Sequence, residues 1–238
     1  MTTPPVRLRD SLQRELPPQQ AFAYDREAWI RWTGDLPNVE RTIKVLPVAI
    51  DRAIVAGITE DRISQGEVVP AFVVAMMWGH GKSNYGPSRT AKVLAGAESA
   101  GTAAGALGAE VIEKLAESVR LARCDGLVEG YRYLNNAGHL KGLGPAFFTK
   151  WLYFATARGH ARSQQAAPVL DALVIRWFKR EADLRLRYGK TSDYERYLEL
   201  LTAWGKPHGL SPVEVEERIF RLIRSDGERR EPLSPGRT

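Results

Sequence analysis

The residue of this chain best suited to covalent chemistry is a lysine, Lys150, placed inside an apolar stretch. Residues 146–157 are almost all apolar or aromatic apart from this one charge, which predicts a helix that is buried on most sides. Burial disfavours the ammonium form of lysine and lowers its pKa. A neutral amine is a nucleophile that attacks carbon and forms a Schiff base. The alternative is that the stem of Lys150 packs while its amine reaches solvent.

An aspartate follows 21 residues later, in front of a second apolar stretch. Asp171 precedes residues 172–178, which include two large aromatic side chains. Its type and position predict an N-cap, whose carboxylate is kept ionised by the backbone N–H groups it accepts. Such a carboxylate can orient an amine, take its proton or stabilise a cationic transition state. Asp171 as a cap and nothing more is the alternative, and the two roles are compatible.

A tight turn precedes the helix of Lys150. Gly142 and Gly144 flank Leu143, and Pro145 occupies the first helical position, where the missing N–H of proline costs nothing. The turn therefore presents free backbone N–H groups and the positive end of a helix dipole. This arrangement suits a phosphate group, and its glycines allow a DNA backbone to approach closely.

Most of the chain shows apolar residues at helical spacing, and no convincing alternating strand pattern is present. We therefore predict an all-α fold held together by helix packing. Ser211 followed by Pro212, with Glu214 three residues after the serine, indicates a helix start. The predicted helices cover 39–55, 68–78, 89–94, 110–124, 126–135, 145–157, 171–187, 194–204 and 212–224.

Both ends of the 238-residue chain differ in composition from its middle. Residues 1–18 contain four prolines and no clear periodicity, which predicts a disordered arm. Residues 225–238 are polar and predict a disordered tail. The helical domain is therefore expected to span 19–224.

Composition excludes several classes of protein. The only cysteine is Cys124, so neither an intramolecular disulfide nor a four-cysteine metal site is available. The histidines His80, His139, His160 and His208 lack metal-ligand spacing, and we expect no metal and no cofactor. No membrane-crossing stretch and no signal peptide are evident, which favours a cytoplasmic protein. The net charge of +6 suits a polyanionic partner.

Taken together, these residues resemble the helix-hairpin-helix DNA glycosylases. The similarity is sharpest over residues 139–178, which hold GLGPAFFTKWLYF and then a Pro-x-x-Asp helix start, and it is closest to prokaryotic 8-oxoguanine DNA glycosylase-like proteins. The resemblance implies two helical subdomains flanking a DNA-binding cleft. It also implies that Lys150 attacks the anomeric carbon, that Asp171 assists, and that the hairpin residues Lys141, Gly142 and Gly144 grip the DNA backbone.

A second segment fits the same resemblance. The loop in residues 78–90 follows a buried helix, and the family uses a loop at this place to fill the gap left by an extruded base. Asn84 and Tyr85 are candidates for that insertion, and Lys82 and Arg89 are candidates for phosphate binding. The alternative is an ordinary polar connection. Aromatic residues available to sandwich a purine are Trp78, Phe147, Trp151 and Trp177.

The resemblance therefore implies an enzyme, expected to be monomeric, that excises an oxidised purine such as 8-oxoguanine from double-stranded DNA through a Lys150 Schiff base. Elimination of the 3′ phosphate would add an abasic-site lyase step. Two alternatives stay open: a non-catalytic helix-hairpin-helix DNA-binding protein, and a helical scaffold that recognises protein. DNA binding that weakens as salt rises separates the last alternative from the others.

Overall fold

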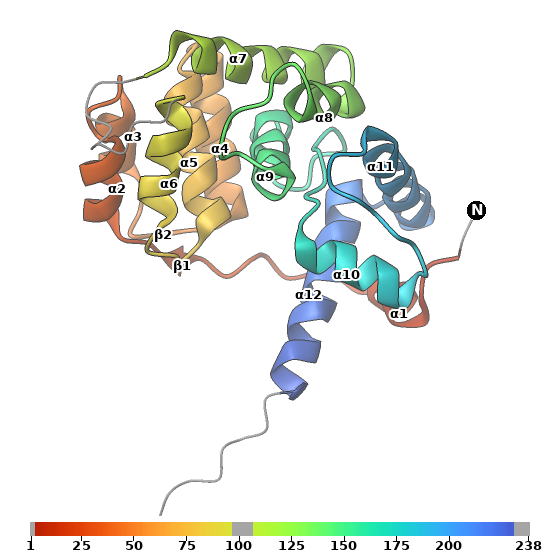
Figure 1. Ribbon diagram of the computed structural model, residues 1–238. Coiled ribbons are helices and arrows are strands. Elements are labelled where there is room, and N and C mark those ends of the chain that lie inside the picture. Colours follow the sequence, from red (N-terminus) through yellow and green to blue (C-terminus); the bar gives the residue numbers. More distant parts are fainter. Residues whose placement is uncertain (1–2, 97–106, 231–238) are drawn as a thin grey trace, which may run out of the picture.

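The computed structural model describes residues 3–96 and 107–230, and most of these residues are helical (Figure 1). The predicted all-α class is confirmed, with one addition: two short strands pair antiparallel, Phe22 opposite Ile50. The elements are α1 (Val6–Leu12), β1 (Phe22–Ala23), α2 (Arg26–Thr33), α3 (Val39–Val45), β2 (Ala49–Ile50), α4 (Arg52–Ser64), α5 (Val68–His80), α6 (Gly86–Leu94), α7 (Ala109–Cys124), α8 (Leu127–Asn135), α9 (Pro145–Thr156), α10 (Ala172–Glu181), α11 (Thr191–Gly205) and α12 (Pro212–Arg230).

Helix α9 lies at the centre of the molecule, between two groups of helices (Figure 1). It packs against α4 and α5, which belong to the N-terminal group, and also against α7 and α8. The second group consists of α10, α11 and α12, with α1 beside α12. Trp151, Leu152 and Phe154 of α9 are completely buried, as the apolar composition of this helix predicts.

The predicted single helix over 39–55 is wrong, because a proline interrupts it. Pro47 cannot donate a backbone hydrogen bond and disfavours helical geometry in the residue before it. Helix α3 ends at Val45, and the chain passes through β2 before α4 begins. Asp51 caps α4 by accepting the backbone N–H of Ile54 at 2.9 Å.

The predicted disordered arm over residues 1–18 is also wrong for the described residues of that range. Residues 6–12 form α1, which packs against α12. Leu8 is fully buried and Leu12 is 3% exposed. Burial of these two leucines, which are spaced for one helical face, stabilises α1 against α12. The proline-rich composition of the segment did not indicate this packing.

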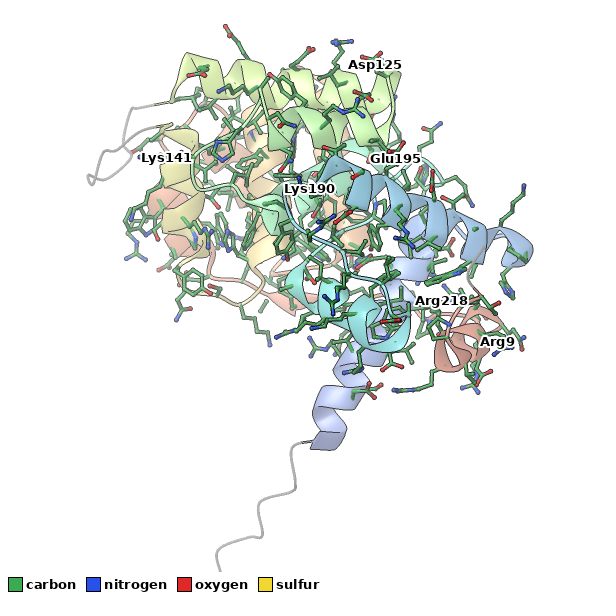
Figure 2. All side chains as sticks on the ribbon, turned by 45° about the vertical axis from the view of Figure 1, so that its right-hand side comes forward. Arg9, Asp125, Lys141, Lys190, Glu195 and Arg218 are labelled. Atoms are coloured by element: carbon green, nitrogen blue, oxygen red, sulfur yellow. The ribbon has the colours of Figure 1, made fainter. Side chains whose placement is uncertain are left out.

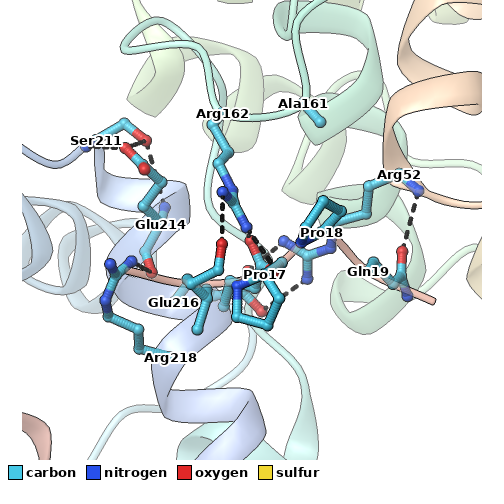
Figure 3. A network of polar contacts seen from close by, with 12 residues as sticks. Pro17, Pro18, Gln19, Arg52, Ala161, Arg162, Ser211, Glu214, Glu216 and Arg218 are labelled. Carbon is cyan, nitrogen blue, oxygen red and sulfur yellow. Dashed lines mark hydrogen bonds and ion pairs between the residues drawn. The ribbon is translucent and has the colours of Figure 1, made fainter. Parts of the chain in front are cut away.

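Arginines from distant parts of the chain hold the proline-rich segment that follows α1 (Figure 3). Arg218 donates to the carbonyl oxygens of Ser11 at 3.0 Å and of Arg14 at 2.9 Å, and Arg162 donates to that of Pro17 at 3.1 Å. A proline-rich segment has few N–H groups, but each residue keeps its carbonyl acceptor. Guanidinium donors satisfy these carbonyls and fix the segment without regular secondary structure.

The predicted tail over residues 225–238 is wrong for its first part, since α12 continues to Arg230. Residues 231–238 lie outside the described range, as does most of the glycine- and alanine-rich stretch after α6. The predicted start of α12 is confirmed: the backbone N–H of Ser211 donates to the Glu214 carboxylate at 2.8 Å, and the Glu214 N–H donates to the Ser211 hydroxyl at 3.3 Å.

A buried ion pair joins the two groups of helices. Arg52, the first residue of α4, is paired with Glu216 of α12 at 3.0 Å, and their side chains are 8% and 2% exposed. The guanidinium carbon of Arg52 also lies 5.0 Å from the centre of the Trp78 ring and 5.2 Å from the centre of the Tyr153 ring. The side-chain oxygen of Gln19 accepts from both the Arg52 backbone N–H and the Trp78 indole, which brings the N-terminal segment into the same cluster.

Removing one partner of this pair should destabilise the fold strongly, because the other charge is left buried without compensation. We expect Arg52→Met to lower the free energy of unfolding by about 3–5 kcal/mol, measured by urea denaturation at neutral pH. Arg7→Met is the matched control, since Arg7 pairs with Asp226 of the same helix α12 but is exposed, and it should cost less than about 1 kcal/mol. Equal losses for the two variants would contradict a structural role for the buried pair.

Candidate active site and DNA-binding surface

The amine of Lys150 is bound to the last turn of α5. Its Nζ donates to the carbonyl oxygen of Gly79 at 2.9 Å and lies 4.7 Å from the centre of the Phe147 ring. The side chain is half-buried. A Cβ atom at position 79 would lie 3.2 Å from Cδ of Lys150, so the glycine makes room for the lysine stem. The lysine is therefore held against the protein interior rather than extended into water.

The surroundings of Lys150 lower the pKa of its amine. Burial is the largest cause, and the positive charge of Arg52 acts in the same direction. The carboxylates of Asp171 and Glu216 act in the opposite direction. Because burial prevails, a larger fraction of the amine is neutral at a given pH than in an exposed lysine, which is the condition for nucleophilic attack.

Asp171 caps α10, as its sequence position predicts. One carboxylate oxygen accepts the backbone N–H groups of Leu173 at 2.9 Å and Val174 at 3.0 Å. Asp171 and Lys150 both lie in the described part of the chain, and they form no ion pair there. Their charges nevertheless interact, because the Asp171 carboxylate raises the pKa of Lys150. The carboxylate is thus fixed by the helix terminus and acts on the amine through space.

Hydroxyl groups from two helices hold the extended segment that leads to Asp171. Threonines of α9 accept backbone N–H groups of this segment, and tyrosines of α11 donate to its carbonyl oxygens. The sequence reasoning missed these residues, because the contacts link positions that are distant in the chain. The contacts are Thr149 with Leu170 (3.2 Å), Thr156 with Ala167 (2.8 Å), Tyr194 with Pro168 (3.1 Å) and Tyr197 with Val169 (2.8 Å).

The predicted glycine turn before α9 has the expected geometry. Gly142 has φ +85°, a left-handed conformation that favours glycine. Leu143 is buried and anchors the turn, and α9 begins at Pro145 after Gly144. Lys141 and Gly142 are exposed. The turn therefore offers an accessible backbone at the start of the helix that carries Lys150.

The loop between α5 and α6 lies next to this turn. The guanidinium carbon of Arg89, at the beginning of α6, lies 5.0 Å from the centre of the Phe147 ring, and Arg89, Gly142 and Phe147 line the same small cavity. Tyr85 is 66% exposed. Lys82, Asn84 and Arg89 are exposed as well. The structure thus brings Arg89 to the hairpin, whereas it leaves the tips of the other three side chains directed to the surface.

A histidine that the sequence reasoning set aside belongs to the same cluster. The ring of His80 stacks on that of Phe147, with centres 4.3 Å apart and planes inclined by 29°. Burial lowers the pKa of His80 to about 4, and the positive charges of Lys150 and Arg89 act in the same direction. The imidazole is therefore neutral near neutral pH. Its position at the end of the apolar stretch 68–78 was the only local signal, and a lone histidine carries little information.

The four aromatic candidates for a purine sandwich are placed differently. Trp151 is fully buried and donates to the hydroxyl of Ser118, and Trp177 is also buried. Trp78 belongs to the cluster around Arg52. The ring of Phe147 lies under the amine of Lys150. Packing in the core accounts for the first three.

The all-α fold, with a glycine turn leading into the helix of Lys150 and an aspartate-capped helix following it in the chain, is that of a helix-hairpin-helix DNA glycosylase-like protein. A family profile described as "Putative 8-oxoguanine DNA glycosylase OGG-like protein" matches residues 15–220. The chain therefore belongs to this OGG-like family, as its sequence motifs predict. A DNA glycosylase-type function and DNA binding follow from that membership. No curated protein and no solved structure matches the chain.

Two further findings concern the described residues alone. Within residues 3–96 and 107–230, no helix is both long and apolar enough to cross a membrane. Across the same ranges, no group of three or more His, Cys, Asp or Glu side chains is arranged to hold a metal ion.

The depressed pKa of His80 predicts how stability depends on pH. The unfolded chain binds a proton at this histidine below about pH 6.5 and the folded chain only below about pH 4, so stability is lost as the pH falls through that interval. We expect the wild type to lose about 1–2 kcal/mol more than His80→Gln between about pH 7.5 and about pH 5, measured by urea denaturation. An identical pH dependence in both proteins would show that His80 titrates normally.

Proposed function

We propose that this protein removes a damaged purine base from double-stranded DNA, with Lys150 as the nucleophile. The observation that carries the proposal is the amine of Lys150, which is half-buried, held at the Gly79 carbonyl and within electrostatic range of Asp171. Family membership supplies the class of reaction. An oxidised purine such as 8-oxoguanine is the first substrate to test.

The first step is attack of the neutral Lys150 amine on the anomeric carbon of the extruded nucleotide. A bond forms between Nζ and C1′ while the bond from C1′ to the base nitrogen breaks, and the electron pair of that bond leaves with the base. The attacking nitrogen then loses a proton, which the departing base takes up. Burial favours this step, because it increases the neutral fraction of the amine.

Asp171 assists by placing a negative charge near the sugar as positive charge develops on it. The N–H groups of the α10 terminus hold the carboxylate in one orientation, so it needs no rearrangement during the reaction. Opening of the sugar ring converts the adduct into an imine. Loss of a C2′ proton from the imine then expels the 3′ phosphate, which gives lyase activity, and water releases Lys150.

Two surface segments are suited to hold the DNA. The backbone of Gly142 and Gly144, together with the charge of Lys141, would bind phosphates at the hairpin. In the loop between α5 and α6 and the first turns of α6, Lys82 and Arg89 would bind the backbone, and the exposed Asn84 and Tyr85 would fill the place of the extruded base.

A non-catalytic DNA-binding protein is the second candidate, and one observation favours it. The Lys150 amine donates to a backbone carbonyl and is not ion-paired with Asp171 in the described structure, an arrangement that a purely structural lysine would share. The two candidates differ in covalent chemistry, because only the enzyme forms an imine with DNA.

Borohydride reduction should trap a covalent adduct between the wild-type protein and a duplex that contains 8-oxoguanine or an abasic site. Lys150→Gln should give no adduct above background, since its amide cannot form the imine. The control is Lys206→Gln, which removes an exposed lysine directly after α11 and should leave the yield of adduct unchanged. No adduct from the wild type, or an undiminished one from Lys150→Gln, would refute the nucleophile.

Substitutions of Asp171 should separate its cap from its charge. Asparagine still caps a helix, so Asp171→Asn should keep most of the stability but lower the single-turnover excision rate by about 100-fold. Asp171→Ala should lose the rate to a similar extent and also about 1 kcal/mol of stability. Excision at the wild-type rate by Asp171→Asn would mean that the aspartate is only a cap.

A further inference from the structure

The loop that joins α10 to α11 displays charged and aromatic side chains in a regular pattern. Leu184 and Leu186 are buried, whereas Arg185, Arg187 and Tyr188 are exposed. The helix predicted over 171–187 is therefore too long, because α10 ends at Glu181 and the chain continues in this alternating form. We call residues 185–190 the basic loop.

Contacts with both flanking helices fix the basic loop in position. The backbone N–H of Leu184 donates to the carbonyl oxygen of Phe178 at 3.1 Å. At the other end, the Asp193 carboxylate accepts the backbone N–H of Arg187 at 3.0 Å and its guanidinium at 2.8 Å. The loop is thus presented in a defined conformation, which lowers the entropy cost of binding a ligand.

The basic loop interacts electrostatically with Asp171 through Tyr188. Tyr188 is 39% exposed, and its hydroxyl is within electrostatic range of both the Asp171 carboxylate and the Arg176 guanidinium. In Figure 2, Lys190 is seen between the hairpin residue Lys141 and Glu195 of α11. An exposed aromatic ring is therefore within electrostatic range of the carboxylate of the proposed active site.

Several cations of α10 and the basic loop are not neutralised by acidic side chains. Arg180 and Arg187 form ion pairs, but no described carboxylate pairs with four other cations of α10 and the basic loop. Exposed acidic residues are present as well: Asp183 lies just before the basic loop and Glu195 lies on α11. The excess of positive charge in this region is therefore moderate. The unpaired cations are Arg176, Lys179, Arg185 and Lys190.

We propose that the basic loop is a further DNA-binding element, contacting the strand that carries the extruded nucleotide. Arg185 and Lys190 would contact phosphates, and the ring of Tyr188 would stack on a neighbouring base. Unpaired cations interleaved with an accessible aromatic ring are the combination with which proteins bind nucleic-acid strands. The placement of the strand rests on the proposed function, because Lys150 and Asp171 define where the nucleotide enters.

The test is the affinity for a duplex with one tetrahydrofuran abasic-site analogue, which cannot form the imine, measured by fluorescence anisotropy over a range of salt concentrations. Tyr188→Ala should bind at least about fivefold more weakly, as expected for loss of one stacked base, whereas Tyr188→Phe should bind like the wild type. Arg185→Gln combined with Lys190→Gln should reduce the slope of log K against log salt by about 2.

The charge control is Arg9→Gln combined with Arg14→Gln, which removes the same charge from exposed positions near α1 and should change neither affinity nor slope. Equal effects of the two double variants, or unchanged binding by Tyr188→Ala, would overturn the proposal, as would a wild type that does not bind DNA. Failure of the proposed function gives a different result: the wild type binds and the loop variants weaken binding, but borohydride traps no adduct.

Discussion

The protonation of the Lys150 amine depends on one balance of forces, that between its burial and the charges around it. Burial against the end of α5 lowers the pKa of the amine, and Arg52 adds to this effect. The carboxylates of Asp171 and Glu216 oppose this shift, because each raises the pKa of the amine. A lysine with too little burial would stay protonated, and one without any acidic neighbour would be costly to place in a half-buried site.

The rest of the fold maintains that balance by fixing each charge separately. The Glu216 carboxylate is paired with Arg52, and Asp171 is bound to the N–H groups of its own helix. Neither acid is therefore free to move onto the lysine and hold it as an ammonium ion. The extended segment before Asp171 is buried and bonded to hydroxyl groups of α9 and α11, which keeps the carboxylate at a set place relative to Lys150.

Features that depend on neighbouring residues were predictable from the sequence. The glycine turn, the apolar helix of Lys150 and the cap at Asp171 all follow from local rules of backbone geometry and amphipathicity. Apolar periodicity failed to predict the helix break at Pro47, because the apolar spacing continues on both sides of this proline. For Leu8, the helical signal was short and lay between prolines, and its burial depends on a helix that is more than 200 residues away in the sequence.

The parts of the site that could not be predicted are those built from long-range contacts. His80 acquires its environment from Phe147 and Lys150, which lie on another helix. The link from Arg162 to Pro17 joins segments with no common sequence pattern. Such contacts are determined by how the helices pack, and periodicity within a single helix carries no information about its partners.

The protonation of the Lys150 amine can be measured directly by NMR titration of its side chain, assigned by comparison with Lys150→Gln. We predict that Lys150 titrates below the usual lysine value of about 10.4, and that it titrates lower still in Asp171→Asn, since the carboxylate raises its pKa. Titration of Lys150 at or above the usual value, unaffected by Asp171→Asn, would contradict the proposed effects of burial and of the carboxylate on this amine.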